Sequence, residues 1–214
     1  MADTNLLVLG TRLLAQEVGS IISSIPGFRL RGFVENQNKE RSAEKILGHP
    51  VYWIDELKTL AKDHKAVSGL TTTQRKLFIE QARKYSIDFS TVIDPHARIS
   101  SDCLIGKGTV AHPGVIVASH VKIGRHVLLN RGSLLGHHTT IGDYTTINPG
   151  ANIAGACTLG NQVYVGIGAV ILDHLTIGDG AIVGAGSVVT ENVPAHAQVV
   201  GIPARVVKQD IEPK

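Results

Sequence analysis

The sequence predicts two domains, a small parallel α/β domain followed by an all-β prism of short parallel strands, and three observations support this fold class. From Ile93 to Val189 an aliphatic residue returns at every sixth position. The residues four positions after each of these are small or branched, and neither set contains a charged side chain. Composition also changes near residue 90: the first 89 residues hold 23 of the 39 Asp, Glu, Lys and Arg, whereas residues 90–193 hold 11.

Residues 1–89 alternate short apolar runs with helical patterns, which is typical of a parallel α/β domain. In chain order we expect a strand at 6–9, a helix at 11–24, a strand at 28–34, a further segment around 54–61, a strand at 66–70 and a helix at 73–85.

Residues 90–193 are predicted to form the prism. A six-residue repeat suits one short strand and a corner, so three repeats make one triangular coil of about 18 residues, and stacked coils bury the aliphatic positions. Glycine often follows the aliphatic residue, as at Gly136, and we interpret it as backbone freedom for a corner. Residues 194–214 leave the repeat and are expected to cap the open end of the core.

Several classes of protein are excluded. The chain has no run of about 18 apolar residues and no N-terminal signal pattern, which predicts a cytoplasmic protein without membrane segments. Cys103 and Cys157 lie three coils apart, too far for a disulfide. The net charge of +3 is too small to indicate nucleic acid binding, although small anionic ligands remain compatible with it.

The uninterrupted repeat resembles that of the left-handed parallel β-helix acyltransferases. The order of a small Rossmann-like domain, a prism without inserted loops and the tail at 200–205 (VGIPAR) resembles the sialic acid O-acetyltransferase family, as do segments 32–35 (GFVE) and 46–51 (ILGHPV). That family includes bacterial N-acetyltransferases acting on nucleotide-linked amino sugars. The resemblance implies a homotrimer that binds acetyl-CoA and its acceptor in clefts between neighbouring prisms.

Segment 130–138 (NRGSLLGHH) aligns with the stretch that carries the family's catalytic histidine, which falls on His137. The repeat independently places His137 on an outward corner, with Gly155 on the same corner one coil later. A histidine can take the proton of the attacking acceptor. The family's backbone donor to the acetyl carbonyl aligns with Gly155, where the absence of a side chain would let a thioester approach.

Four further residues are candidates for binding the acceptor. Asn130 aligns with a family residue near the acceptor, although asparagine also tolerates left-handed corners. His138 stands where the family commonly has a carboxylate, and it either orients the acceptor or is a solvated corner. Arg12 interrupts the expected glycine-rich turn and could bind a diphosphate by charge. Glu35, at the end of the second strand, is placed for a ribose or base contact.

The sequence therefore predicts an acetyl-CoA-dependent acetyltransferase acting on an amino sugar, with a nucleotide-linked sugar favoured over a free one. O-acetylation of a sugar such as sialic acid, or of a small amino acid such as serine, is the nearest alternative. A non-catalytic trimeric scaffold is the alternative of another class. No metal site is expected: His138 and His174 have carbonic anhydrase-like spacing, but the third position is Asp179.

Overall fold

The computed structural model describes residues 3–214, which form two compact units. The first unit runs to Thr71 and resumes at Arg75–Pro95, and the second consists of Thr72–Gln74 and His96–Lys214. The units thus divide at residue 95, six residues beyond the boundary expected from composition. The reason is that Phe89 and Val92 are buried in the first unit, where the helix Leu13–Ser24 (α1) contacts the strand Val92–Ile93 (β7).

The first unit is a six-stranded sheet with the strand order β3-β4-β2-β1-β5-β6. Its strands are β1 (Thr4–Leu9), β2 (Phe28–Glu35), β3 (Lys45–Ile46), β4 (His49–Trp53), β5 (Lys65–Ser68) and β6 (Asp88–Phe89). All neighbours pair in parallel except β3 and β4, which are antiparallel. Leu6, Leu7, Val8 and Leu9 are fully buried, as expected of a parallel strand covered on both faces.

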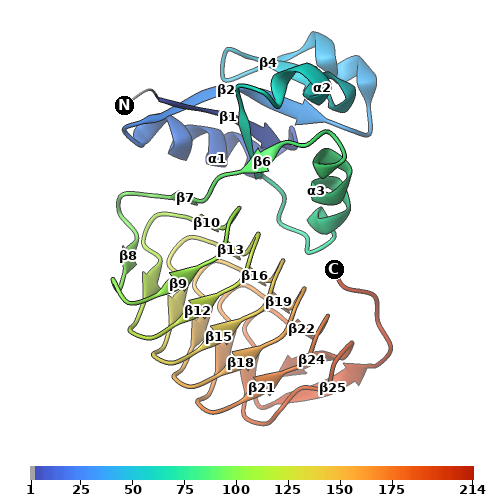
Figure 1. Ribbon diagram of the computed structural model, residues 1–214. Coiled ribbons are helices and arrows are strands. Elements are labelled where there is room, and N and C mark those ends of the chain that lie inside the picture. Colours follow the sequence, from blue (N-terminus) through green and yellow to red (C-terminus); the bar gives the residue numbers. More distant parts are fainter. Residues whose placement is uncertain (1–2) are drawn as a thin grey trace. The chain divides into compact units, whose positions relative to one another are not determined.

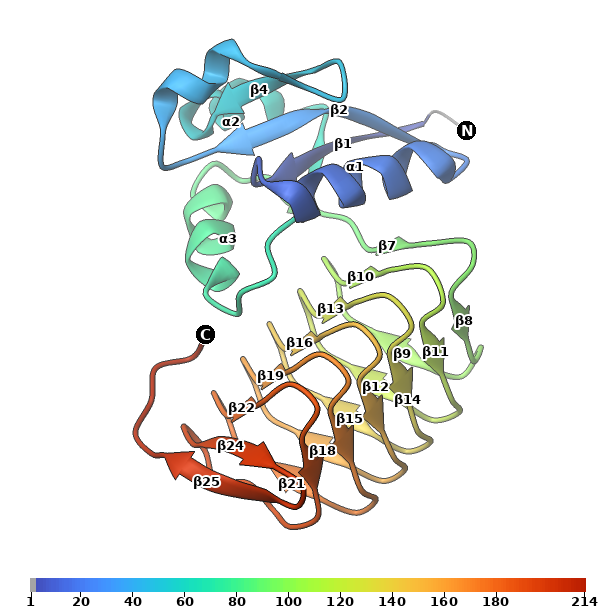
Figure 2. The same cartoon turned by 180° about the vertical axis from the view of Figure 1, so that it is seen from behind.

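The helices of this unit are α1 (Leu13–Ser24), α2 (Leu57–Leu60) and α3 (Arg75–Arg83), with 3-10 turns at Lys39–Ala43 and Ile54–Glu56. Helix α1 lies against β1 and β2, as Figure 2 shows. It starts two residues later than the sequence predicts, because Arg12 is still extended. Strand β4 was not among the expected elements, since His49-Pro50 at its start lacks a strand pattern.

The second unit is a left-handed parallel β-helix whose strands are two residues long (Figure 1). They are β8 (Arg98–Ile99), β9 (Leu104–Ile105), β10 (Val110–Ala111), β11 (Ile116–Val117), β12 (Lys122–Ile123), β13 (Leu128–Leu129), β14 (Leu134–Leu135), β15 (Thr140–Ile141), β16 (Thr146–Ile147), β17 (Asn152–Ile153), β18 (Thr158–Leu159), β19 (Tyr164–Val165), β20 (Val170–Ile171), β21 (Thr176–Ile177), β22 (Ile182–Val183) and β23 (Val188–Val189).

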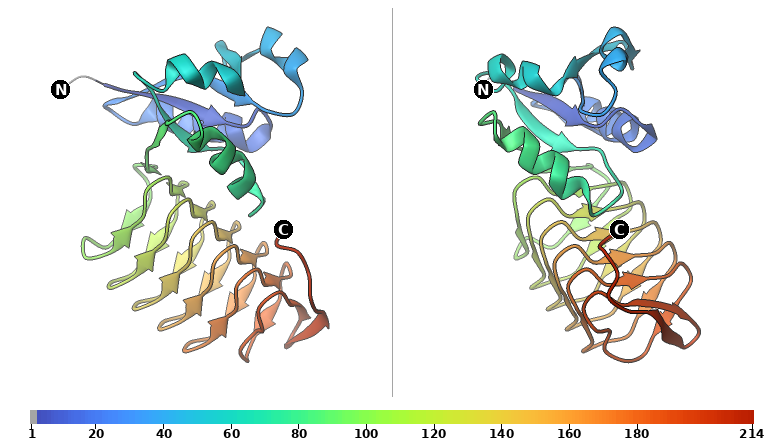
Figure 3. Two further views of the ribbon diagram at one scale, coloured as in Figure 1. Left: turned by 45° about the vertical axis from the view of Figure 1, so that its right-hand side comes forward. Right: turned by 90° about the vertical axis from the view of Figure 1, so that its right-hand side faces the viewer.

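Strands of the β-helix pair with the strand 18 residues later, so the predicted coil length is confirmed. Leu135 is opposite Ile153, and Ile153 is opposite Ile171, each pair one coil apart. Every third strand joins one of three parallel sheets, which make the faces of the prism in Figure 3. The aliphatic positions point inward; Ile141, Ile147 and Ile153 are at most 1% exposed.

The glycines that follow the aliphatic positions were expected to give the corners backbone freedom, and the structure shows that this interpretation is wrong. At the corners from Gly108 to Gly186 the left-handed residue is the second turn residue, which is either glycine or a residue such as His138 at φ 61°. Glycines that follow the aliphatic position serve close packing instead: a Cβ at Gly136 would lie 2.5 Å from backbone atoms of the next coil. The coils therefore stack too closely there for a side chain.

The repeat ends with a coil shortened by two residues. Ile182 pairs with Gln198, 16 residues later, in strand β24 (Gln198–Gly201), and β25 (Ala204–Lys208) folds back antiparallel on β24. Ala197, just before β24, and Val199, within it, are buried. In residues 3–214 no helix is long and apolar enough to cross a membrane.

Candidate active site

His137 and His138 form the corner that follows β14. The corner is fixed by the backbone on both sides, because the His138 N–H donates to Ser119 O in the coil before (3.0 Å) and the His137 carbonyl accepts from the Ala156 N–H in the coil after (2.8 Å). Both imidazoles are exposed. The backbone thus presents two adjacent histidine side chains to solvent from a rigid position.

Gly155 lies directly against the ring of His137. A Cβ atom at Gly155 would be 2.7 Å from His137 Cε1 and 2.9 Å from Nε2, closer than any normal contact. The expected neighbourhood of these two residues is therefore present. The space left by the missing side chain at Gly155 holds the imidazole, which gives this glycine a structural reason in addition to the expected approach of a thioester.

The Gly155 N–H has no hydrogen-bond acceptor among residues 3–214. On the next corner of the prism, a carboxylate or amide of each coil accepts from the backbone N–H one coil below, with distances of 2.7–2.9 Å. That ladder pairs Asp143 with the N–H of Arg125, Asn161 with that of Asp143, and Asp179 with that of Asn161. No side chain or carbonyl among residues 3–214 accepts from Gly155 in this way. The Gly155 N–H, beside the imidazole of His137, is therefore available to a ligand.

His138 is in contact with histidines in its own coil and in the coil before. Its Nδ1 lies 3.2 Å from Nδ1 of His137, and the two rings are nearly perpendicular. On its other side the ring of His120 lies 4.7 Å away between centroids. His120 Nδ1 is in turn 2.8 Å from a carboxylate oxygen of Asp102. Sequence reasoning missed His120 and Asp102, although the spacing 102, 120 and 138 marks one corner of successive coils.

A second cluster of candidate binding residues lies in the α/β unit, where β1 leads into α1. Gly10 turns the chain with φ +111°, and the first N–H groups of α1 have no side-chain cap and no acidic residue in the first turn. An open depression of about 460 Å³ lies at this helix end. It is lined by Thr11, Arg12, Leu13, Gln16, Asn38, Arg41 and Glu44. Uncapped helix N–H groups next to arginine favour an anion.

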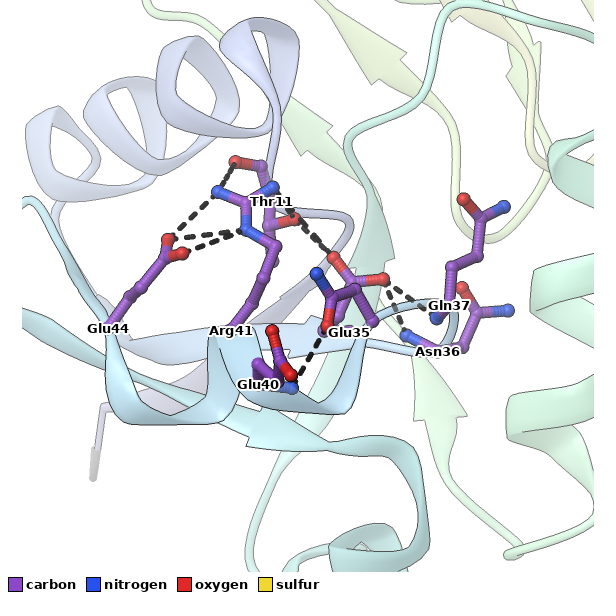
Figure 4. Close-up of polar contacts among 8 residues, drawn as sticks. Thr11, Glu35, Asn36, Gln37, Glu40, Arg41 and Glu44 are labelled. Atoms are coloured by element: carbon purple, nitrogen blue, oxygen red, sulfur yellow. Dashed lines mark hydrogen bonds and ion pairs between the residues drawn. The ribbon is translucent and has the colours of Figure 1, made fainter.

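Glu35 is buried. Figure 4 shows that its carboxylate faces Thr11 on one side and the backbone of Asn36 and Gln37 on the other. Its carboxylate accepts from the Thr11 hydroxyl and from the backbone N–H groups of Asn36 and Gln37. Burial raises the pKa of Glu35, but these hydrogen bonds outweigh burial and leave the pKa below its usual value. The carboxylate therefore holds the β1–α1 turn to the end of β2.

Arg41 belongs to this cluster and was not among the candidates that the sequence indicated. Its guanidinium donates to the Thr11 hydroxyl (2.8 Å) and to Glu44 (3.0 Å), and it lies 4.0 Å from Glu35. It comes from the 3-10 turn Lys39–Ala43, whose N-cap Asn38 accepts from the Glu40 N–H. Nothing in the local sequence distinguishes this arginine from its neighbours, since only the fold brings the turn over Thr11.

Asn130 is almost fully buried on a different corner from His137. Its Oδ1 accepts from the Arg131 N–H at 2.8 Å, which stabilises that corner. Arg12 is exposed at the rim of the depression. Within residues 3–214 no three His, Cys, Asp or Glu side chains are grouped to hold a metal ion.

Comparison with known families identifies the repeat. Residues 120–155 and 156–191 match the model described as bacterial transferase hexapeptide (six repeats). Both matched segments lie within the β-helix. Comparison with curated protein sequences gives no significant match.

Solved structures match the chain across both the β-helix and the α/β unit. A mutant perosamine N-acetyltransferase from Caulobacter crescentus, solved with CoA and GDP-perosamine, is 23% identical with a TM-score of 0.89, covering 97% of this chain and 98% of that one. The acetyltransferase domain of PglB from Neisseria gonorrhoeae is 21% identical with a TM-score of 0.88, covering 96% and 100%. WeeI from Acinetobacter baumannii is 29% identical with a TM-score of 0.85, covering 95% and 100%.

Proposed function

We propose that this protein is an acetyl-CoA-dependent acetyltransferase that acylates the amino group of a nucleotide-linked sugar. The observation that carries the proposal is the pairing of an exposed imidazole, His137, with an unused backbone donor, the N–H of Gly155. The structural similarity to a perosamine N-acetyltransferase that was solved with CoA and GDP-perosamine supports this proposed activity.

The reaction follows from these two groups. His137 Nε2 removes a proton from the sugar amine while the amine nitrogen attacks the thioester carbonyl of acetyl-CoA. The negative charge that develops on the carbonyl oxygen is stabilised by the Gly155 N–H, a contribution of up to about 3 kcal/mol for such a donor. When the tetrahedral intermediate collapses, the C–S bond breaks and the CoA thiolate takes the proton from the imidazolium of His137.

The nucleotide of the acceptor is assigned to the depression at the start of α1. Two arginines, Arg12 and Arg41, line it beside uncapped helix N–H groups, and both can bind a diphosphate through charge-assisted hydrogen bonds. The glycine-rich turn expected from the resemblance is reduced to Gly10 here, so side-chain cations would replace backbone contacts. Glu35 is assigned the role of holding Thr11 and the turn, because its oxygens are already engaged.

The assembly is proposed to be a homotrimer. The β-helix exposes aliphatic side chains that a monomer would leave in water, including Leu104 (64% exposed), Ile116 (47%) and Ile167 (60%). Covering such residues favours association. The implied clefts between neighbouring prisms would then depend on assembly.

A thiol-release assay tests the activity. Acetyl-CoA is incubated with the protein and with UDP- and GDP-linked amino sugars, the corresponding free amino sugars, sialic acid and serine. Release of CoA with a nucleotide-linked amino sugar alone supports the proposal. Release with sialic acid or serine indicates O-acetylation, and no release with any acceptor favours a non-catalytic scaffold.

A further inference from the structure

One corner of the β-helix carries a ladder of three residues, Asp102, His120 and His138, in successive coils. A carboxylate oxygen of Asp102 accepts from the backbone N–H of His120 (3.1 Å) and lies 2.8 Å from His120 Nδ1. The His120 ring packs against that of His138, with centroids 4.7 Å apart. The ladder ends on His137, where the two Nδ1 atoms are 3.2 Å apart.

The contact between His137 and His138 restricts where their protons can be. A hydrogen bond between two Nδ1 atoms requires that one is protonated and the other is not. If His137 donates, its neutral ring carries the proton on Nδ1, and its Nε2 keeps a lone pair. If His138 donates, neutral His137 is protonated on Nε2 and cannot act there as a base. The direction of this bond therefore decides whether His137 can accept a proton at Nε2.

We propose that His138 is a positioning residue that accepts the Nδ1–H of His137 and so keeps Nε2 of His137 unprotonated. An imidazole would then serve in this chain where the resembled family commonly has a carboxylate. The proposal deepens the proposed function, because it concerns the base of that reaction.

The surroundings of His138 support a fixed acceptor. Its backbone is held at φ 61°, with its N–H bonded to Ser119 O, and its ring is confined on one side by His120, which Asp102 anchors. One coil beyond Gly155 on the same corner, Asp173 and His174 lie 3.6 Å from each other. The charged and titratable side chains around the pair are therefore Asp102 and His120 on one side and Asp173 and His174 on the other.

Nitrogen-15 NMR of histidine-labelled protein tests the proposal without any substrate. At about pH 8, where ordinary imidazoles are neutral, the shifts of the two ring nitrogens report which one carries the proton. His137→Gln assigns the signals of His137. In the wild type we expect the ring proton of His137 to be on Nδ1. In His138→Phe we expect it on Nε2, because phenylalanine keeps a ring against His120 but offers no acceptor.

Two matched variants separate positioning from structural effects. His138→Asn keeps an acceptor near the Nδ1 position and suits a left-handed corner, so His137 should keep its Nδ1 proton. His174→Phe places the same substitution on the same type of corner, at φ 59°, and removes a ring that pairs with Asp173. The His174→Phe variant should leave the NMR signals of His137 unchanged. Its melting temperature should fall by about as much as that of His138→Phe, if the latter falls at all.

Turnover gives the second measurement. Removal of the group that sets a catalytic histidine's tautomer lowers kcat by up to about 10⁴ in serine proteases. For this exposed pair we expect His138→Phe to lower kcat about tenfold or more with KM for acetyl-CoA unchanged. His138→Asn should retain kcat within about threefold.

A wild-type His137 with its proton on Nε2 overturns the proposal, as does an unchanged His137 spectrum in His138→Phe. If that variant does not fold, the wild-type and His138→Asn spectra still decide the question. Absence of acetyl transfer in the wild type would refute the proposed function only, since the tautomer is measured in the free protein.

Discussion

Gly155→Ala is the smallest change that tests the geometry of the proposed active site. The added methyl carbon would lie 2.7 Å from His137 Cε1 and 2.9 Å from Nε2. Ordinary van der Waals contact begins at 3.4 Å, so the ring has to retreat by about 0.7 Å. The backbone accepts alanine without strain, because Gly155 is not among the residues with positive φ. The Gly155 N–H also remains in place.

The expected result is a loss of rate without a loss of stability. Misplacement of a catalytic group by about 1 Å can lower the rate about a hundredfold, so we expect kcat to fall about ten- to a hundredfold, or about 1.4–2.7 kcal/mol in activation free energy. The exposed ring can turn toward solvent, so the melting temperature should change by no more than about 2 °C. Steady-state thiol release and thermal unfolding measure the two quantities.

A double-mutant cycle provides the control. If Gly155 acts through the His137 ring, then His137→Ala with Gly155→Ala should be no slower than His137→Ala alone. An unchanged kcat in Gly155→Ala would refute the geometric argument. Losses that multiply in the double variant would show that Gly155 has an effect independent of the ring, such as filling the path of the thioester.

Three further predictions concern His137, the arginines at the start of α1, and Glu35. His137→Ala should lower kcat at least about a hundredfold while KM for acetyl-CoA stays nearly constant in steady-state kinetics; unchanged turnover removes His137 from the reaction. Arg12→Ala and Arg41→Ala should each weaken GDP or UDP binding about ten- to a hundredfold by calorimetry, and a wild type that binds neither nucleotide contradicts the diphosphate assignment. Glu35, whose pKa is lowered by folding, should stabilise the α/β unit above about pH 4.5, the ordinary glutamate value, and lose that contribution as pH falls further. The difference in melting temperature between wild type and Glu35→Gln should therefore shrink below pH 4.5, and a constant difference would speak against it.

The β-helix was predictable from sequence because every coil repeats the same local requirement. An inward aliphatic position such as Leu135 returns at a fixed interval, and a charge there would be buried, so the period is visible without any long-range information. The same period places His137 over Gly155 and puts Asp102, His120 and His138 on one corner. Residues of the repeat can thus be assigned to neighbouring positions by counting in steps of 18.

The α/β unit offers no such counting rule. Arg41 reaches Thr11 only because β2 and the turn that follows it bring residue 41 above the start of α1, and Glu35 is engaged by backbone N–H groups formed by that turn. The sequence by itself determined the solenoid, its coil length and the pairing of His137 with Gly155. The tertiary structure decided the partners of Glu35, the place of Arg41 and the contact between His137 and His138, because these depend on side-chain directions that residue spacing does not specify.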